Sequence, residues 1–341
     1  MLTTFVRSER EKSGRPDDFG AMVNMLLVLT VTAAMSVYYY GIRAAVLCVL
    51  CVGVCWGLDV LCLIIQRKSL HIHDVSPIIT GLTIALMMPA SVPFTAAAAV
   101  CAFAICIAKH PFGGHGREIV NCAAAGYIFA ELCFPSAALQ YPKPMTVLPL
   151  TNIITEGLYP SFTSAAMRST SAAYTDIELL IGNFTGPMGC TFTVLTAVCA
   201  LYLISRKAIS GTVFFTELVV IIGWSFATGG TFKVKTALVG GMLLFGLSVL
   251  SCDNNIVPKT VPERIFFGVV SAVILIAAGE ISRLENPVVY AAVLSAPFGR
   301  LTGKFGERAL RRKRAKSIFG KYADDISETI AMTGGGDNGS S

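Results

Sequence analysis

The sequence predicts an all-α, multi-pass membrane protein with about ten transmembrane helices in two inverted five-helix repeats, and three observations carry that prediction. Of the 341 residues, 54% are hydrophobic and only 14% are charged, whereas about a quarter of the residues of a soluble domain are charged. Apolar runs close to the roughly 20 residues that span a bilayer recur along the chain. One long polar insertion, residues 139–187, divides these runs into five and five.

The predicted spans follow the apolar runs in order. They cover residues 21–41, 44–65, 76–92, 94–108, 119–138, 188–205, 211–228, 235–251, 265–281 and 286–302. Several are short for a full crossing, which favours tilt, re-entry or burial within the bundle. An odd number of spans per half requires the halves to lie inverted in the membrane. Weak internal similarity agrees, because ITGLTIALMMPAS (79–91) resembles LVGGMLLFGLSVLS (238–251).

The basic residues predict the orientation. With the N-terminus in the cytoplasm, 21 of the 27 Lys and Arg residues fall on the cytoplasmic side, as the positive-inside rule requires. We therefore expect both termini inside the cell (inner) membrane and residues 139–187 outside. The expected organisation is a cytoplasmic segment (1–20), a first membrane half (21–138), the outer loop (139–187), a second membrane half (188–302) and a basic tail with a disordered end (303–341). The tail has no aromatic interleaving, so its expected partner is the bilayer and no nucleic acid.

Ionisable residues within the spans have two interpretations. Asp59, Glu131, Glu217 and Glu280 could lie on an ion path or hold buried polar networks together. The eleven cysteines mostly lie inside apolar runs, which favours a role as small apolar residues of helices. The four histidines, His71, His73, His110 and His115, lie in two loops. We expect them to face solvent or lipid headgroups, with metal ligation as the alternative.

A glycine-rich turn, KHPFGGHGREIVNCAAAGY (109–127), separates two spans. Its glycines could simply allow a tight reversal. Alternatively, Gly113 and Gly114 could let the backbone and the following helix N-terminus approach an anionic or planar ligand. Asn121 lies just inside the next span, where its amide needs a partner such as a ligand carbonyl or neighbouring backbone.

Five segments resemble, in order, the blocks of the RnfD/NqrB family of membrane subunits, and the short chain resembles RnfD more closely. The turn segment KHPFGGHGREIVNCAAAGYIFAELCFP resembles the family pattern K-x-x-F-G-G-x-G-x-N-x-F-N-P-A. The other four segments are HIHDVSPIITGLTIALMMPASVPF, LLIGNFTGPMGCT, SCDNNIVPKTVPERIFFG and ENPVVYAAVLSAP. The sequence departs from the family patterns at three positions. Glu118 replaces the first asparagine of the turn, Cys122 replaces a proline, and Cys190 replaces an acidic residue. The chain is thus identified as a divergent member.

The resemblance implies two inverted five-helix halves and a flavin mononucleotide (FMN) joined through its phosphate to a threonine of the outer loop. The family's acceptor position falls on Ala166, which has no hydroxyl to form the ester. Three outcomes stay open: a neighbouring threonine carries the flavin, the flavin binds without a covalent link, or the site is lost. The cofactor-binding residues that follow are Thr163, Ser164, Thr170, Gly113, Gly114, Asn121 and Asp253, with Thr170 as first choice for the link. Neither a catalytic residue nor a metal ligand is predicted.

Two functions remain open at this point. The resemblance implies a non-autonomous subunit of an Rnf-like complex, which couples electron transfer from ferredoxin to NAD to the translocation of sodium or protons. Its partners would be other membrane subunits and subunits that carry flavin or iron–sulfur centres. The alternative is a transporter, channel or structural subunit that keeps the same scaffold without a cofactor.

Overall fold

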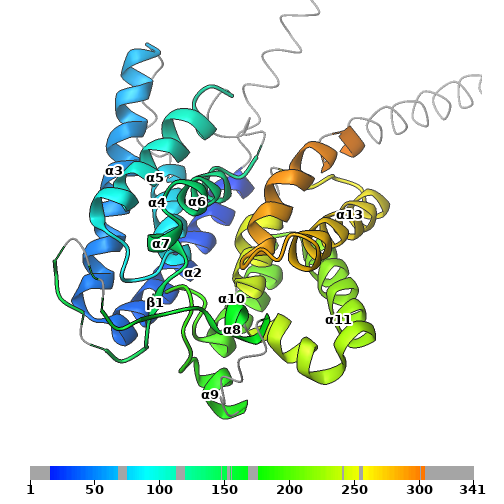
Figure 1. The fold of residues 1–341 in the computed structure, drawn as a ribbon. Coiled ribbons are helices and arrows are strands. Elements are labelled where there is room, and N and C mark those ends of the chain that lie inside the picture. Colours follow the sequence, from blue (N-terminus) through cyan, green and yellow to red (C-terminus); the bar gives the residue numbers. More distant parts are fainter. Residues whose placement is uncertain are drawn as a thin grey trace, which may run out of the picture.

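The computed structural model describes residues 16–67, 75–112, 120–146, 148–151, 154, 156–167, 176–239, 242–252, 256–299 and 301–303. Within these residues the chain is almost entirely helical, and its two halves occupy the left and right of Figure 1. The N-terminal half consists of α2 (Pro16–Tyr40), α3 (Ile42–Ile65), α4 (Ser76–Met87), α5 (Phe94–Phe103) with its π-helical continuation η1 (Ala104–Lys109), and α6 (Cys122–Cys133). The C-terminal half consists of α10 (Thr193–Ser205), α11 (Gly211–Val239), α12 (Leu243–Gly246) with its π-helical continuation η2 (Leu247–Ser251), α13 (Val261–Glu280) and a helix over residues 287–299.

Four helices are long and apolar enough to cross a bilayer: Phe19–Tyr40, Ile42–Ile65, Gly211–Val239 and Val261–Glu280. Four shorter apolar helices accompany them: Ser76–Met87, Phe94–Lys109, Cys122–Cys133 and Thr193–Ser205. The shorter α4 packs against α2 and α3, and every residue from Thr80 to Val92 is buried. The protein is thus a mostly helical, multi-pass membrane protein.

Three predicted span boundaries were wrong. The span predicted over 76–92 stops at Met87, before Pro89, and the span predicted over 119–138 divides into α6 and α7 (Pro135–Ala138). Proline has no N–H to continue a helix and favours the first turn of the next one. Residues 235–239 belong to the end of α11, and the helix predicted over 235–251 begins only at Leu243.

The segment between the two halves contains short elements. They are α7, β1 (Tyr141–Pro142), β2 (Leu158–Tyr159), α8 (Phe162–Met167) and α9 (Asp176–Ile181). The two strands pair antiparallel, with Tyr141 opposite Tyr159. This segment is tied to α2, because Tyr39 donates to the Ile181 carbonyl at 2.7 Å and Ser36 donates to the Met188 carbonyl at 2.9 Å. These hydrogen bonds hold the described parts of the segment against the C-terminal end of α2.

The C-terminal end of α4 lies inside the bundle, where its free carbonyls need donors. The backbone N–H of Gly189 donates to the Leu86 carbonyl at 2.8 Å, and that of Met188 donates to the Met88 carbonyl at 3.2 Å. A Cβ at position 189 would lie 2.7 Å from the Leu86 Cβ. A glycine at position 189 therefore allows this turn to donate its N–H groups to the free carbonyls at the end of α4.

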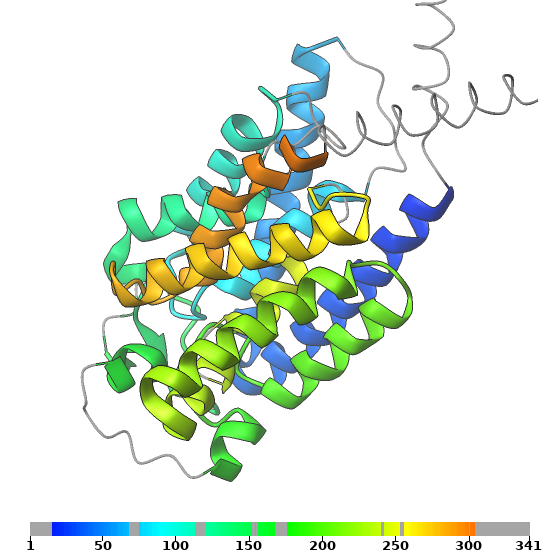
Figure 2. The same ribbon diagram turned by 90° about the vertical axis from the view of Figure 1, so that its right-hand side faces the viewer.

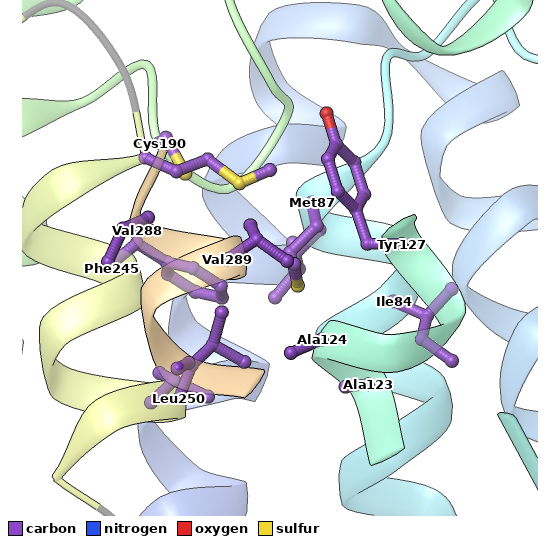
Figure 3. Close-up of a cluster of buried hydrophobic side chains, with 14 of the residues drawn as sticks. Ile84, Met87, Ala123, Ala124, Tyr127, Cys190, Phe245, Leu250, Val288 and Val289 are labelled. Atoms are coloured by element: carbon purple, nitrogen blue, oxygen red, sulfur yellow. The ribbon is translucent and has the colours of Figure 1, made fainter. Parts of the chain in front are cut away.

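The two halves share one hydrophobic core. Figure 3 shows side chains of α4 and α6 facing side chains of α12, η2 and the 287–299 helix. The facing residues are Ile84, Met87, Ala123, Ala124 and Tyr127 on one side and Phe245, Leu250, Val288 and Val289 on the other. The small alanines of α6 allow the backbones to approach closely, as is typical of helix contacts in membranes.

Arg43, at the start of α3, fixes the adjoining loops and is only 1% exposed. Its Nε donates to the Ala90 carbonyl at 2.7 Å and its Nη1 to the Pro149 carbonyl at 2.8 Å. The guanidinium also lies 4.7 Å from the centre of the Phe94 ring. Arg43 therefore joins α3 to two loops through buried hydrogen bonds. The sequence-based prediction of orientation had counted Arg43 as an ordinary loop residue.

Candidate functional site

A cavity of about 480 Å³ lies between α11, α13 and the segment that leads into the 287–299 helix. Its volume is within the range of about 300–1,000 Å³ that is usual for small-molecule sites. Figure 2 shows α11 and α13 running alongside each other on this side of the molecule. The side chains that give the cavity its chemistry are Thr163, Trp224, Phe232, Lys233, Glu280 and Arg283.

A sharp bend in α11 builds one wall of the cavity. Gly230 has a φ of 62° and a ψ of −154°, a conformation that is accessible essentially only to glycine. The bend redirects residues 231–239, so that Phe232 and Lys233 line the same cavity as Trp224 from the part of α11 before the bend.

The cavity wall combines aromatic faces with cations. Trp224 is 46% exposed and Phe232 is 66% exposed, so their ring surfaces are available to a ligand. Lys233 forms an ion pair with Glu280 of α13, and Arg283 lies just beyond the end of that helix. Aromatic faces stack on planar rings, and lysine and arginine pair with phosphate. The wall therefore offers groups of the kind that stack on a planar ring and pair with a phosphate, beside the carboxyl groups of Glu280 and Glu285.

Thr163 reaches the cavity from α8, and the segment 182–190 holds that helix in place. The Phe162 N–H donates to the Thr185 carbonyl at 3.0 Å, and the Thr185 hydroxyl donates to the Pro160 carbonyl at 2.9 Å. The Phe162 and Phe184 rings pack with their centres 5.9 Å apart. The segment GNFTGPMGC (182–190) thus contacts two helices. Thr185 positions α8, and the N–H groups of Met188 and Gly189 bind the free carbonyls at the end of α4.

The other predicted cofactor residues have different surroundings. The Ser164 hydroxyl donates to the Ser161 carbonyl at 3.1 Å, while the Ser164 N–H donates to Ser161 Oγ. Asn121 is the N-cap of α6, because its Oδ1 accepts from the N–H groups of Ala123 and Ala124 at 3.0 and 3.2 Å. The remaining predicted residues, Gly113, Gly114, Thr170 and Asp253, lie outside the described residues.

A buried polar network links the two halves next to this cavity. Tyr290 donates to Glu131 Oε2 at 2.6 Å, and Asn286 donates to the Tyr127 hydroxyl at 2.9 Å. Tyr141 of β1 lies beside this group, and burial raises the pKa of its phenol well above the usual value. Glu285, next to Asn286, lines the cavity. The network therefore joins α6 to the start of the 287–299 helix at the edge of the cavity.

A second buried polar cluster joins α3 to the end of η1. Asp59 Oδ1 lies 3.0 Å from Lys109 Nζ and 3.0 Å from His110 Nε2. Gln66 contacts the other ring nitrogen of His110 at 3.3 Å. The expectation that His110 faces solvent or headgroups was wrong, because it is buried against Asp59. Lys109 is only 1% exposed, and its charge is offset by Asp59. It is therefore weak evidence for which side of the membrane the adjoining loop faces.

Sequence patterns carried no signal for most of the cavity. Trp224, Phe232, Lys233 and Arg283 come from two helices and a loop, and their spacing matches no ligand motif. The sequence feature that could have revealed them is the segment Gly229-Gly230-Thr231-Phe232-Lys233, in which a glycine pair interrupts an apolar run just before an aromatic residue and a lysine. Ionisable groups beside such a break are typical of intramembrane sites.

The helices and the cavity define a multi-pass membrane protein with a cavity of small-molecule size at one side of its bundle. The chain belongs to the NQR2, RnfD, RnfE family, whose sequence pattern matches residues 15–301. It is 27% identical over 261 residues to the D subunit of the proton-translocating ferredoxin:NAD(+) oxidoreductase complex of Clostridium ljungdahlii, covering 72% of this chain and 77% of that protein. It is 23% identical over 248 residues to the D subunit of the Na(+)-translocating ferredoxin:NAD(+) oxidoreductase complex of Acetobacterium woodii, covering 73% and 76%.

Proposed function

We propose that this protein is the RnfD-type membrane subunit of an Rnf-like complex, in which electron transfer between ferredoxin and NAD drives ion translocation. Family membership over residues 15–301 supports the assignment, as do the two relatives, of which the match covers 77% and 76%. The chain would act with other membrane subunits and with subunits that carry flavin or iron–sulfur centres, since electron transfer needs cofactors beyond its own.

The proposed architecture is ten transmembrane helices in two inverted five-helix repeats. The packing supports it, because three corresponding pairs of helices are in contact in both halves. In the first, α3 packs against α4 and α5, and α2 packs against α4; in the second, α11 packs against α12 and α13, and α10 packs against α12. We place residues 21–138 and 188–302 as the two halves, 139–187 outside the inner membrane, and residues 1–20 and 303–341 in the cytoplasm.

We further propose that the cavity between α11 and α13 holds FMN. The observation that carries this proposal is the meeting of a threonine, two aromatic faces and two basic side chains in one cavity of suitable volume, which Glu280 and Glu285 also line. Trp224 and Phe232 would hold the ring system, and Lys233 and Arg283 would offset phosphate charge. When bound, the flavin would supply one- and two-electron redox chemistry, and the protein would set its position.

Two threonines are candidates for a phosphoester with the flavin, because Ala166 cannot form one. Thr163 lines the cavity, which favours it over the sequence-based first choice, Thr170. Thr170 follows seven residues later and stays the second candidate. Binding by Gly113, Gly114, Asn121 or Asp253 stays a separate proposal for the opposite end of the bundle.

The test uses the two tryptophans of the chain as a matched pair. The complex is purified with Trp224→Leu or with Trp56→Leu, a change on α3 outside the cavity, and its flavin content and ferredoxin-dependent NAD reduction are measured. We expect Trp224→Leu to lose flavin from this subunit and to lose the activity, with Trp56→Leu unchanged. Equal flavin content in the two variants would show that the flavin does not bind in this cavity. A wild-type subunit free of flavin in an active complex would favour the cofactor-free scaffold instead.

A further inference from the structure

One acidic residue lies deep in the bundle without a counter-charge. Glu217 belongs to the buried face of α11 and is 0% exposed. Within the described residues neither of its carboxyl oxygens has a hydrogen-bond partner of good geometry, and the Ser271 hydroxyl of α13 lies beside the group. An ionised carboxylate in such a place is strongly disfavoured unless a cation or several donors accompany it.

Glu217 lies directly beneath the cavity. Ile221 of α11 and Leu275 of α13 line the cavity floor, and Glu217 and Ser271 are four residues before them on the same two helices. Four residues make one helical turn, or about 6 Å along the axis. Ser225, one turn on the other side of Ile221, also lines the cavity. The carboxyl is thus separated from the cavity by one layer of apolar side chains.

Within the described residues, the elements that pack against α11 offer no charge to pair with Glu217. The helices α12 and η2 (Leu243–Ser251) and α8 (Phe162–Met167), which pack against α11, have no titratable side chain. Those of α13 lie at its two ends, at least seven residues from Ser271, and Arg264 donates to the Pro258 carbonyl. These α13 groups are Glu263, Arg264 and Glu280, and Glu280 is paired with Lys233.

Close packing of α11 against α13 also blocks access to Glu217 from the start of α11. A Cβ at Gly268 would lie 3.0 Å from the Thr216 Cβ and 3.4 Å from the Val213 carbonyl oxygen. The two helices therefore meet closely one turn below Glu217, and access from that side requires them to part.

We propose that Glu217 is a proton-binding carboxyl, and that the ion held at this position is a proton and not sodium. A hard cation such as Na⁺ needs several oxygen ligands, whereas the site offers one carboxyl and one hydroxyl. A proton satisfies the carboxyl without further ligands. Intramembrane acidic residues of this kind occur on proton pathways, and negative charge in the cavity one turn away would strengthen proton binding. This use in translocation rests on the proposed function.

The test is modification of the full-length chain, in membranes that contain its complex, by the apolar reagent dicyclohexylcarbodiimide. This reagent attacks protonated carboxyls in apolar surroundings and adds to them as a whole. Peptide mass analysis is expected to show one adduct on Glu217 at neutral pH, at equal yield in sodium and choline salts, and none in Glu217→Gln. The control carboxyl Glu263, in the first turn of α13, is expected to stay unmodified. A Glu217 that stays unmodified, or that sodium protects, would overturn the proposal.

A second measurement guards against a folding defect. Glutamine has the shape and neutrality of protonated glutamate, so Glu217→Gln is expected to keep the thermal midpoint of the wild-type chain. A large fall in the midpoint would indicate that the carboxyl is ionised and would overturn the proposal. Neither measurement requires bound flavin. Their outcome therefore tests the role of Glu217 separately from the flavin assignment.

Discussion

Replacing Asp59 with asparagine is expected to destabilise the protein strongly, because it leaves a buried lysine without a counter-charge. Asp59 Oδ1 contacts both Lys109 Nζ and His110 Nε2 at 3.0 Å, and the Lys109 side chain is 1% exposed. Removing one partner of a buried ion pair typically costs about 3–5 kcal/mol. At roughly 1–2 °C per kcal/mol for a chain of 341 residues, the thermal midpoint should fall by about 3–10 °C.

The control for this prediction is the half-exposed pair of Lys233 and Glu280, whose side chains are 36% and 42% exposed. Exposed ion pairs contribute about 0–1 kcal/mol, so Glu280→Gln should leave the midpoint almost unchanged. The assay is thermal unfolding of the detergent-solubilised chain, followed by loss of the monodisperse peak in size-exclusion chromatography. The double variant Asp59→Asn with Lys109→Met should recover most of the loss, because replacing both partners is often near neutral. Equal midpoints for Asp59→Asn and Glu280→Gln would refute the reasoning.

Three further predictions use other parts of the structure. Gly189→Ala should destabilise the chain by about 1–3 kcal/mol, because the new Cβ would lie 2.7 Å from the Leu86 Cβ and overpacking costs that much; Gly57→Ala, with nothing within 4 Å, should be tolerated in the same thermal assay. Asn121→Ala should cost about 1 kcal/mol by removing the cap of α6, and Asn121→Asp should restore it; flavin loss in the stable Asp variant would reveal a cofactor role beyond capping. Cysteine at exposed Met145 should react with a membrane-impermeant maleimide from outside, and labelling only after permeabilisation would invert the proposed orientation.

Much of the fold could be predicted from the sequence, because the apolar runs are long and their breaks fall at polar loops. Each predicted span overlaps a helix within the described residues. The errors in the boundaries have local causes: prolines stop α4 and start α7, and Gly230 bends α11 inside a continuous apolar run. A bend at a glycine depends on what packs around it, so the run alone could not locate it.

The buried charges could not be predicted in the same way. Arg43 and Lys109 each border a loop in the sequence, and loop position alone predicts solvent exposure. Their burial depends on acceptors from distant segments, such as the Ala90 carbonyl for Arg43 and the carboxylate of Asp59 for Lys109. A list of basic residues contains no information about these partners.

The candidate site was predictable only in part. Thr163 was among the predicted residues because of a family resemblance, and the structure places it in the wall of a cavity. The aromatic and cationic residues around it were missed, because packing of α11 on α13 brings them together and no motif spans them. The turn residues Gly113 and Gly114 remain predictions.

The central claim is that this chain carries FMN in the cavity between α11 and α13, and peptide mass analysis of the chain purified with its partner subunits tests it most directly. We predict that the peptide containing Thr163 carries the mass of FMN less one water, that Thr163→Val removes this mass, and that Thr163→Ser retains it, since only the hydroxyl is needed. An unmodified chain that is also free of tightly bound flavin, in a complex that still reduces NAD with ferredoxin, would contradict the claim.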